Sequence, residues 1–196
     1  DNGQGRVTAA SRKYIGNPWP KMTMGVNMSF AYKGFDLALV FNGAFGFDIM
    51  NLVKPYTHMF MSDNTTAAIF GTSCFGKGNT TVTSDPRVGY LDETGKVIGD
   101  GAANKNYSTV SGYFVEKGDY LKLKNLSFGY TLPQKYSRKA KMEKLRVYFS
   151  AQNLFTITKY SGIDPEIGGN SLMYNVDHHN RYLPSRLFSF GLDVTF

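Results

Sequence analysis

Two polar stretches hold the residues whose types and spacing are the best candidates for binding a metal ion. Asp164 and Glu166 flank a proline, as in a turn where the aspartate accepts backbone hydrogen bonds. The alternative interpretation is that these two carboxylates bind Ca²⁺. His178 and His179 are adjacent, and adjacent side chains seldom converge on one ion without further ligands. We therefore expect no resident metal ion or other cofactor, with Ca²⁺ in the loops as the alternative.

The chain contains one cysteine, Cys74, and no set of residues typical of a catalytic site. A disulfide bond within the chain is therefore excluded. Cys74 lies among glycine, threonine and serine residues, which favours an incidental free thiol over a functional one. The sequence predicts a protein that is not an enzyme.

Aromatic residues are the best candidates for contacting a ligand. Six of them lie in polar stretches that we expect to be loops: Trp19, Tyr56, Tyr113, Tyr160, Tyr174 and Tyr182. Aromatic rings with a polar edge suit contact with sugar rings or with a partner protein. Packing of these rings among the loops themselves is an equally good interpretation for each residue.

The net charge of +7 favours an acidic partner. One short segment between two predicted strands is strongly basic, with Lys135, Arg138, Lys139, Lys141 and Lys144. This segment lacks the series of interleaved aromatic residues that would stack on bases, so we expect no nucleic-acid binding. A turn that meets the phosphate groups of lipids is the better interpretation.

The elements that position these residues are strands, and the last stretch is the most regular. Residues 187–196 alternate without a break, and large apolar side chains occupy every second position: Phe188, Phe190, Leu192, Val194 and Phe196. A strand that closes a barrel in the bacterial outer membrane has this pattern, because its apolar face meets lipid and its polar face meets the lumen. The stretch also resembles the C-terminal signal that the barrel assembly machinery recognises.

Four further stretches alternate in the same way, at about 21–33, 35–49, 120–132 and 145–158. Lys33-Gly34 predicts a two-residue turn between the first two strands, because glycine supplies a positive φ. A change of parity at Lys124-Asn125 predicts a β-bulge in the third strand.

Long loops are expected at about 1–20, 50–118 and 159–185, with a short helix near residues 52–61. Short turns and long loops alternate along the chain, which predicts that the long loops lie on the extracellular side of a membrane.

The polar faces of the predicted strands decide between two fold classes. A soluble sheet usually turns Lys, Glu and Arg toward water, whereas these faces hold mostly Gly, Ala, Ser, Thr and Asn. Small neutral side chains suit the lumen of a transmembrane barrel, and strands of roughly 10–14 residues cross a bilayer when they are tilted. The alternative is a soluble β-sandwich that acts as an adhesion or carbohydrate-binding module.

A sheet of five strands has two open edges, which lipid does not tolerate. We therefore expect an all-β fold, the C-terminal five antiparallel strands of a larger barrel integral to the outer membrane. Lys122 and Lys124 should point into the lumen, because an ammonium facing lipid costs about 2–4 kcal/mol at the midplane. There they would pair with carboxylates or contact a substrate.

Several ordered motifs resemble the SusC/RagA family of TonB-dependent outer-membrane transporters. They lie at residues 32–37, 118–133, 145–155, 160–166 and 188–196. The resemblance implies a 22-stranded barrel with an N-terminal plug, which is absent from this chain and whose carboxylates would pair with Lys122 and Lys124. A SusD-like surface lipoprotein, which could itself carry Ca²⁺, would cap the barrel. It implies energy supplied by TonB with ExbB and ExbD, acting through the plug region. It further implies import of a large nutrient across the outer membrane, a glycan or oligosaccharide, with RagA-like import of oligopeptides as the alternative.

Overall fold

The computed structural model describes residues 12–58, 90–91, 97–98, 110–167, 173–178 and 182–196. The chain divides into two compact units, each built from three segments. The first unit comprises residues 1–18, 48–116 and 167–181, and the second comprises residues 19–47, 117–166 and 182–196. No helix in the described part of the chain is long and apolar enough to cross a membrane.

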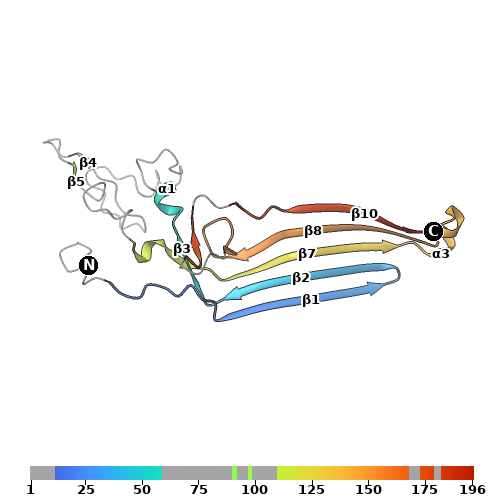
Figure 1. Cartoon of the computed structure of the whole chain (residues 1–196), viewed down its shortest axis with the longest axis horizontal. Helices are drawn as coiled ribbons and strands as arrows, with labels where there is room; N and C mark the ends of the chain where they lie inside the picture. The colour runs from blue at the N-terminus through green and yellow to red at the C-terminus, as the bar shows by residue number, and fades with distance from the viewer. Residues whose placement is uncertain (1–11, 59–89, 92–96, 99–109, 168–172, 179–181) are drawn as a thin grey trace. The chain divides into compact units, whose positions relative to one another are not determined.

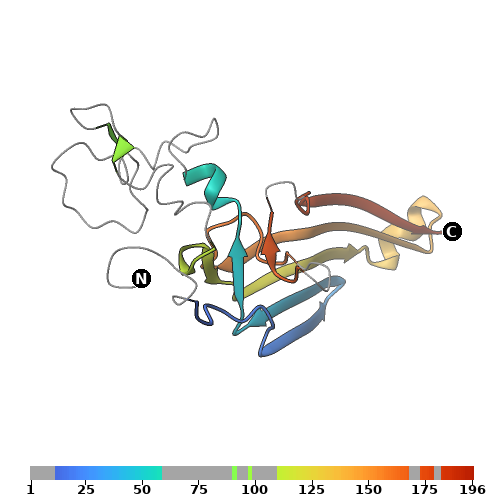
Figure 2. The same cartoon turned by 60° about the vertical axis from the view of Figure 1, so that its left-hand side comes forward.

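The second unit is a sheet of five long antiparallel strands (Figure 1). The strands are β1 (Met22–Tyr32), β2 (Phe35–Phe45), β7 (Tyr120–Thr131), β8 (Lys144–Thr158) and β10 (Leu187–Thr195). They lie side by side in the order in which they occur in the chain, as the turned view in Figure 2 also shows. The five predicted strands are thus present and neighbour one another in the predicted order.

The hairpin between β1 and β2 turns at Lys33 and Gly34. Tyr32 pairs directly with Phe35, and the two turn residues have φ values of 47° and 89°. Positive φ at both central positions matches the twist of the flanking strands, which confirms the predicted two-residue turn.

The predicted bulge in β7 is also present. Leu123 pairs with Phe41 of β2, and Asn125 pairs with the adjacent Val40, so Lys124 is an extra residue on its strand. Because of this extra residue, Leu126, Phe128 and Tyr130 lie on the apolar face although they differ in parity from Leu121 and Leu123.

The predicted strand at 35–49 is wrong in its second part. β2 ends at Phe45, and β3 (Asp48–Asn51) belongs to a different sheet. Gly46 between them has a φ of 77°, which residues with a Cβ rarely adopt, and its N–H donates to Asp119 Oδ1 at 2.6 Å. Alternation continues through this turn in the sequence, although the strand does not.

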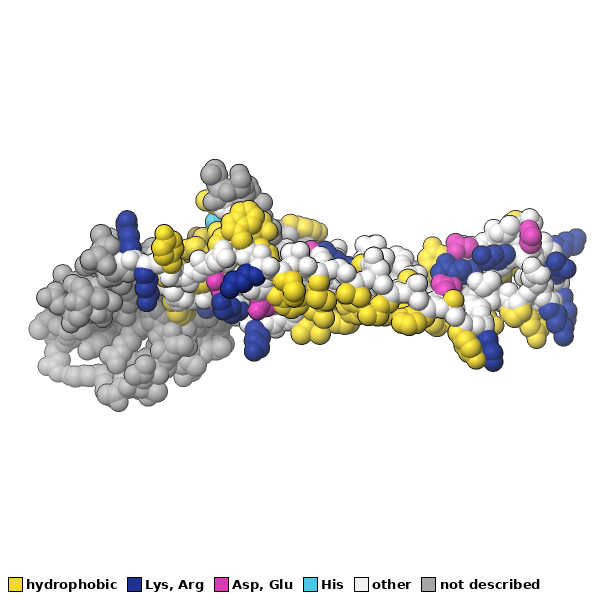
Figure 3. Space-filling view, turned by 90° about the horizontal axis from the view of Figure 1, so that it is seen from below, with side chains coloured by type: hydrophobic (Ala, Val, Ile, Leu, Met, Phe, Trp, Pro, Cys, Tyr) yellow, Lys and Arg dark blue, Asp and Glu magenta, His cyan; other side chains and the backbone are white. Residues whose placement is uncertain are grey.

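The two faces of the five-stranded sheet differ in chemistry, as two adjacent rows of paired residues show. One row crosses all five strands as Ser29, Ala38, Ser127, Ser150 and Ser189. The next row, on the opposite face, consists of Phe30, Leu37, Phe128, Phe149 and Phe190. Figure 3 shows hydrophobic side chains gathered along one side of the strands and charged ones gathered at a strand end.

The apolar face is not buried. Phe190, Leu192 and Phe196 are 83, 66 and 88% exposed, and Phe188 and Val194 are exposed as well. A soluble sandwich would bury this face in its core, so the sandwich interpretation is wrong for this sheet.

The first unit contains a small sheet with the order β6 (Val115–Lys117), β3 and β9 (Val176–Asp177), in which β3 and β9 are parallel. Helix α1 (Lys54–His58) lies within the predicted helical stretch 52–61, and a 3₁₀ turn, η2 (Gly112–Phe114), precedes β6. The short strands β4 (Tyr90–Leu91) and β5 (Val97–Ile98) form an antiparallel pair.

Candidate functional site

The most enclosed charge of the second unit is Lys122, on the polar face of the sheet. In the register it lies between Asn42 of β2 and Thr156 of β8, and it is 1% exposed. Its Nζ donates to both carboxylate oxygens of Asp164, at 2.8 and 2.7 Å, and to Glu166 Oε2 at 2.8 Å. An ammonium has three donors, so all of them are satisfied by carboxylate oxygens.

The two carboxylates belong to a tight turn that follows β8. Asp164 Oδ1 accepts the backbone N–H of Glu166 at 2.9 Å, as predicted for a turn, and Pro165 between them is fully buried. Lys124 adds a second cation, with its Nζ 2.7 Å from Glu166 Oε2. Lys122, Lys124, Asp164 and Glu166 are called the lysine–carboxylate cluster below.

Electrostatics in this cluster favour the ionised form of Glu166. Partial burial raises the pKa of Glu166, but the hydrogen bonds from Lys122 and Lys124 outweigh that effect, so the pKa lies below its ordinary value of 4.5.

The cluster differs from the prediction in its partners. Lys122 was expected to pair with carboxylates of a plug domain, yet Asp164 and Glu166 come from this chain's own turn. Since the ammonium of Lys122 lies between the two carboxylates, the position that a Ca²⁺ ion would need there is filled.

A recess of about 350 Å³ with a mixed lining adjoins the cluster. Its polar residues are Lys122, Asn153, Thr156, Thr158, Asp164 and Arg186, and its apolar residues are Phe155, Ile163, Leu183 and Pro184. Hydroxyl, amide and guanidinium groups of this kind suit the hydroxyl or carboxylate groups of a ligand.

A second charged group on the polar face joins three strands. Arg146 of β8 donates through Nε and Nη2 to the two oxygens of Asp36 on β2, at 3.0 and 2.6 Å. Its Nη1 donates to Asp193 Oδ2 on β10 at 2.9 Å. The guanidinium crosses β7 at Gly129, where a Cβ would lie 2.6 Å from Nη2. Sequence reasoning missed this group, although the charged residues Asp36, Arg146 and Asp193 on faces that hold mostly small neutral side chains were a signal.

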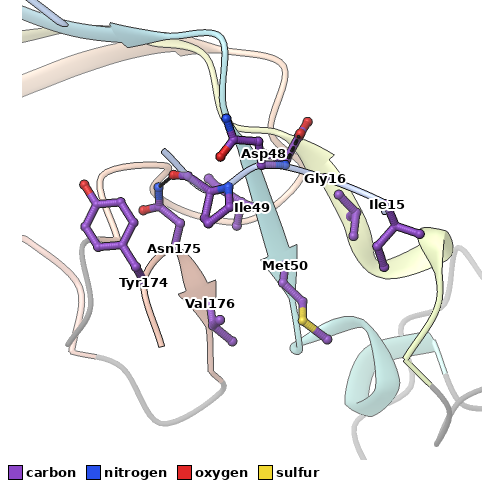
Figure 4. Close-up of a pocket in the computed structure, with 11 residues that line it drawn as sticks. Ile15, Gly16, Asp48, Ile49, Met50, Tyr174, Asn175 and Val176 are labelled. Carbon is purple, nitrogen blue, oxygen red and sulfur yellow. Dashed lines mark hydrogen bonds between the residues drawn. The ribbon is translucent and has the colours of Figure 1, made fainter. Parts of the chain in front are cut away.

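In the first unit, a mostly apolar recess of about 190 Å³ lies beside β3 and β9 (Figure 4). Its lining includes Ile15, Met50 and Val176. Asn175 is buried, and its Nδ2 donates to the carbonyl of Pro18 at 2.6 Å, which fixes the wall of the recess. A recess of this size and lining suits a single apolar side chain of a ligand or partner.

Three of the predicted contact aromatics are accessible. Trp19 is 59% exposed, Tyr56 is 43% exposed and Tyr182 is 97% exposed. Their role in contacting a substrate or partner stays a prediction.

The other three aromatics are engaged within the chain. Tyr113 lies beneath Lys54, whose Nζ is 4.9 Å from the ring centroid, and Tyr174 lines the apolar recess. Tyr160 is only 5% exposed and lies over Gly162, which favours the alternative interpretation of packing within the chain, and its contact role stays a prediction. The glycine leaves room for the ring to pack inward, which the residue type of Tyr160 did not reveal.

The predicted metal ligands do not form a site in the described part of the chain, where no group of three His, Cys, Asp or Glu side chains gathers. His178 follows β9, whereas His179 and Cys74 lie outside the described residues.

The sequence is similar to those of known proteins, although not through a family model. No protein-family model matches the chain. The chain is 33% identical to TonB-dependent receptor P3 of Formosa agariphila over 204 residues, and 25% identical to TonB-dependent receptor SusC of Bacteroides thetaiotaomicron over 197 residues. Both matches cover 100% of this chain but only 18% and 17% of the relatives.

Solved structures give the same fold. The chain superimposes on the RagAB peptide transporter with a TM-score of 0.73, covering 98% of this chain and 19% of that one at 22% identity. For the RagAB peptide importer in its closed-closed state the TM-score is 0.69, also at 22% identity.

The fold and the polar-face geometry are therefore those of a segment of the β-barrel of a TonB-dependent outer-membrane transporter. Within that class, the chain belongs to the SusC/RagA family. It spans about a fifth of the length of the curated relatives it matches.

Proposed function

We propose that this chain forms part of the wall of an outer-membrane importer that carries a large nutrient into the periplasm. The observation that carries the proposal is the contrast between the two faces of one sheet. A row of serine and alanine side chains on one face lies beside a row of phenylalanine and leucine side chains on the other, of which Phe30, Phe128 and Phe190 are exposed. A wall between lipid and a wide aqueous lumen requires this contrast.

Strand length supports the same role. β1 and β2 have 11 residues each and β7 has 12. At about 3.3 Å per residue and a tilt of roughly 45°, such strands rise about 25 Å, which is the height of the apolar band of outer-membrane barrels. The proposed location is accordingly the outer membrane, with the long loops at about 1–20, 50–118 and 159–185 on the extracellular side.

The proposed substrate is a glycan or oligosaccharide, and an oligopeptide is the alternative. The likeness to the RagAB structures is below 25% identity and supports the fold alone, so it does not favour the peptide. The accessible rings of Trp19, Tyr56 and Tyr182 suit stacking on sugars. The hydroxyl and guanidinium groups in the recess beside Lys122 suit hydroxyl-rich ligands as well, and its apolar residues suit the faces of sugar rings.

The proposed partners follow from the family. A SusD-like lipoprotein would cover the extracellular mouth, and TonB with ExbB and ExbD would supply energy through a plug domain. The proposed activity is transport, without chemical conversion of the substrate.

Gene deletion in the source bacterium tests the proposal. Uptake of fluorescent oligosaccharides of increasing length, and of labelled peptides, is measured in the deletion strain and in a strain complemented with the complete receptor. We expect loss of uptake for one substrate class, restoration by complementation, and abolition by a protonophore because import depends on the proton-motive force. Unchanged growth and uptake on all glycan and peptide sources would remove the support for an importer.

A further inference from the structure

The basic turn between β7 and β8 has no role in the transport proposal and carries an unusual charge. It comprises α3 (Gln134–Ser137) and η3 (Arg138–Ala140) and leads into β8. Its cationic residues are Lys135, Arg138, Lys139, Lys141 and Lys144, all of which are exposed. They come within ten positions, with Glu143 as the one acidic residue among them.

Four of these cations form no ion pair within the described part of the chain. Arg146 of the neighbouring polar face is fully paired with two aspartates. By contrast, no carboxylate of the described residues forms an ion pair with Lys135, Arg138, Lys139 or Lys141. Four uncompensated charges on one short turn favour an anionic partner.

The turn is held in a defined conformation that keeps these charges together. The N–H of Tyr136 donates to the carbonyl of Pro133 at 2.9 Å, and the N–H of Met142 donates to that of Ser137 at 3.1 Å. Ser137 is 1% exposed, and Lys141 takes a left-handed φ of 59° that ends η3. The cations are therefore presented by an ordered turn.

The position of the turn identifies the kind of partner. It lies at the same end of the sheet as the β1–β2 hairpin (Figure 1), where Phe35 packs on Phe128 at 5.9 Å and on Tyr130 at 4.4 Å. Aromatic clusters of this kind mark the boundary of the apolar band in outer-membrane barrels. In Figure 3, Lys and Arg side chains gather at the end of the strands, beyond the hydrophobic side chains.

The distance of the basic turn from the aromatic cluster also places its cations at the depth of lipid headgroups. Lys144 lies three residues beyond Val147, the β8 partner of Tyr130, which is about 10 Å along the strand and about 7 Å in height when the strand is tilted. The headgroup layer of a bilayer is roughly 5–8 Å thick on each side. The cations of the turn therefore reach the phosphate groups of the adjoining leaflet, and the exposed Tyr136 has the amphipathic ring typical of that layer.

We propose that the basic turn at 133–144 is a binding site for anionic phospholipid headgroups on the leaflet next to the short turns of the barrel. The inference rests on the membrane embedding of the sheet and not on the identity of the imported nutrient. Each lysine or arginine at such a surface strengthens binding by about fivefold. Loss of three of them should weaken the binding of an anionic lipid by about 100-fold at low ionic strength.

The experiment uses the complete receptor in nonionic detergent, titrated with short-chain phosphatidylglycerol or with phosphatidylcholine of the same chain length. Native mass spectrometry measures the lipid bound. The variant K135Q/R138Q/K139Q removes three charges from the turn, and K135R/R138K/K139R keeps them. The control R12Q/K13Q/K159Q removes three exposed charges from elsewhere in the chain.

We expect the wild type, the charge-keeping variant and the control to prefer phosphatidylglycerol, and the neutral variant to lose that preference. Equal binding of the two lipids by the wild type would overturn the proposal. An undiminished preference in the neutral variant would do the same, and would point to a soluble acidic partner for the turn. If the control lost the preference for phosphatidylglycerol to the same extent, net charge alone would explain the binding, and the proposal would also be overturned. None of these results alters import measured in cells, so the two proposals fail separately.

Discussion

Replacing Lys122 by methionine in the complete receptor tests whether the lysine–carboxylate cluster fixes the turn after β8. Methionine keeps most of the length of the lysine stem but removes all three hydrogen bonds of its ammonium. Lys124 remains on Glu166, whereas Asp164 keeps only its bond to the N–H of Glu166. The turn should therefore open locally more often.

The burial of this ion pair sets the free-energy cost of Lys122→Met. Breaking a buried ion pair by removing one partner costs roughly 3–5 kcal/mol. Lys122 is 1% exposed, but the side chains of Asp164 and Glu166 are 13% and 28% exposed, so water partly solvates the carboxylates left behind. We expect a cost at the lower end, about 3 kcal/mol, which corresponds to about a 150-fold increase in the population of the open turn.

Hydrogen–deuterium exchange of the peptide covering residues 160–167 measures this opening directly. The exposed neighbour Lys159 provides the matched control, because Lys159→Met removes a charge without touching the cluster. The variant K122M/D164N/E166Q leaves no buried charge unpaired and should recover much of the protection. An increase in exchange below about fivefold for Lys122→Met would refute the reasoning.

Three further outcomes follow from the geometry. Lowering the pH from 7 to 4.5 should leave the protection of residues 160–167 against exchange unchanged. The folded-state pKa of Glu166 lies below its ordinary value of 4.5, so the stability that this carboxylate contributes is complete above pH 4.5 and is lost as the pH falls through the lowered pKa. Hydrogen–deuterium exchange measured between pH 7 and pH 3 checks this. Gly129→Ala should lower the free energy of unfolding, measured by urea titration, by about 1–3 kcal/mol, because the added Cβ would lie 2.6 Å from Arg146 Nη2. Gly112→Ala is the control and should be neutral, because no atom lies within 4 Å of its added Cβ. Leu39→Lys on the apolar face should lower the free energy of unfolding in liposomes by about 2–4 kcal/mol, and Ala38→Lys on the polar face should lower it much less. Equal effects of the two variants would contradict the assignment of the faces.

The strands, the hairpin and the bulge were all predictable from the sequence, because each is a local property of the chain. Alternation with period two assigns Phe190 and Ser189 to opposite faces without knowledge of any neighbour. The turn at Lys33-Gly34 requires a positive φ that glycine supplies, and the bulge at Lys124 appears as a break in parity.

The break at Gly46 was not predictable in this way. Its N–H is held by Asp119, which lies 73 residues further along the chain. Alternating residue types continue from β2 into β3, and Gly43 within β2 shows that a glycine alone does not mark the point where the strand leaves the sheet.

Residue types alone determined that this chain forms long strands with one apolar and one small polar face. The tertiary structure alone decided which charges meet on the polar face. Lys122 pairs with a carboxylate 42 residues away, and Arg146 with one 110 residues away. Such pairings depend on strand register and on the position of a turn over the sheet, and both are fixed only when the strands assemble.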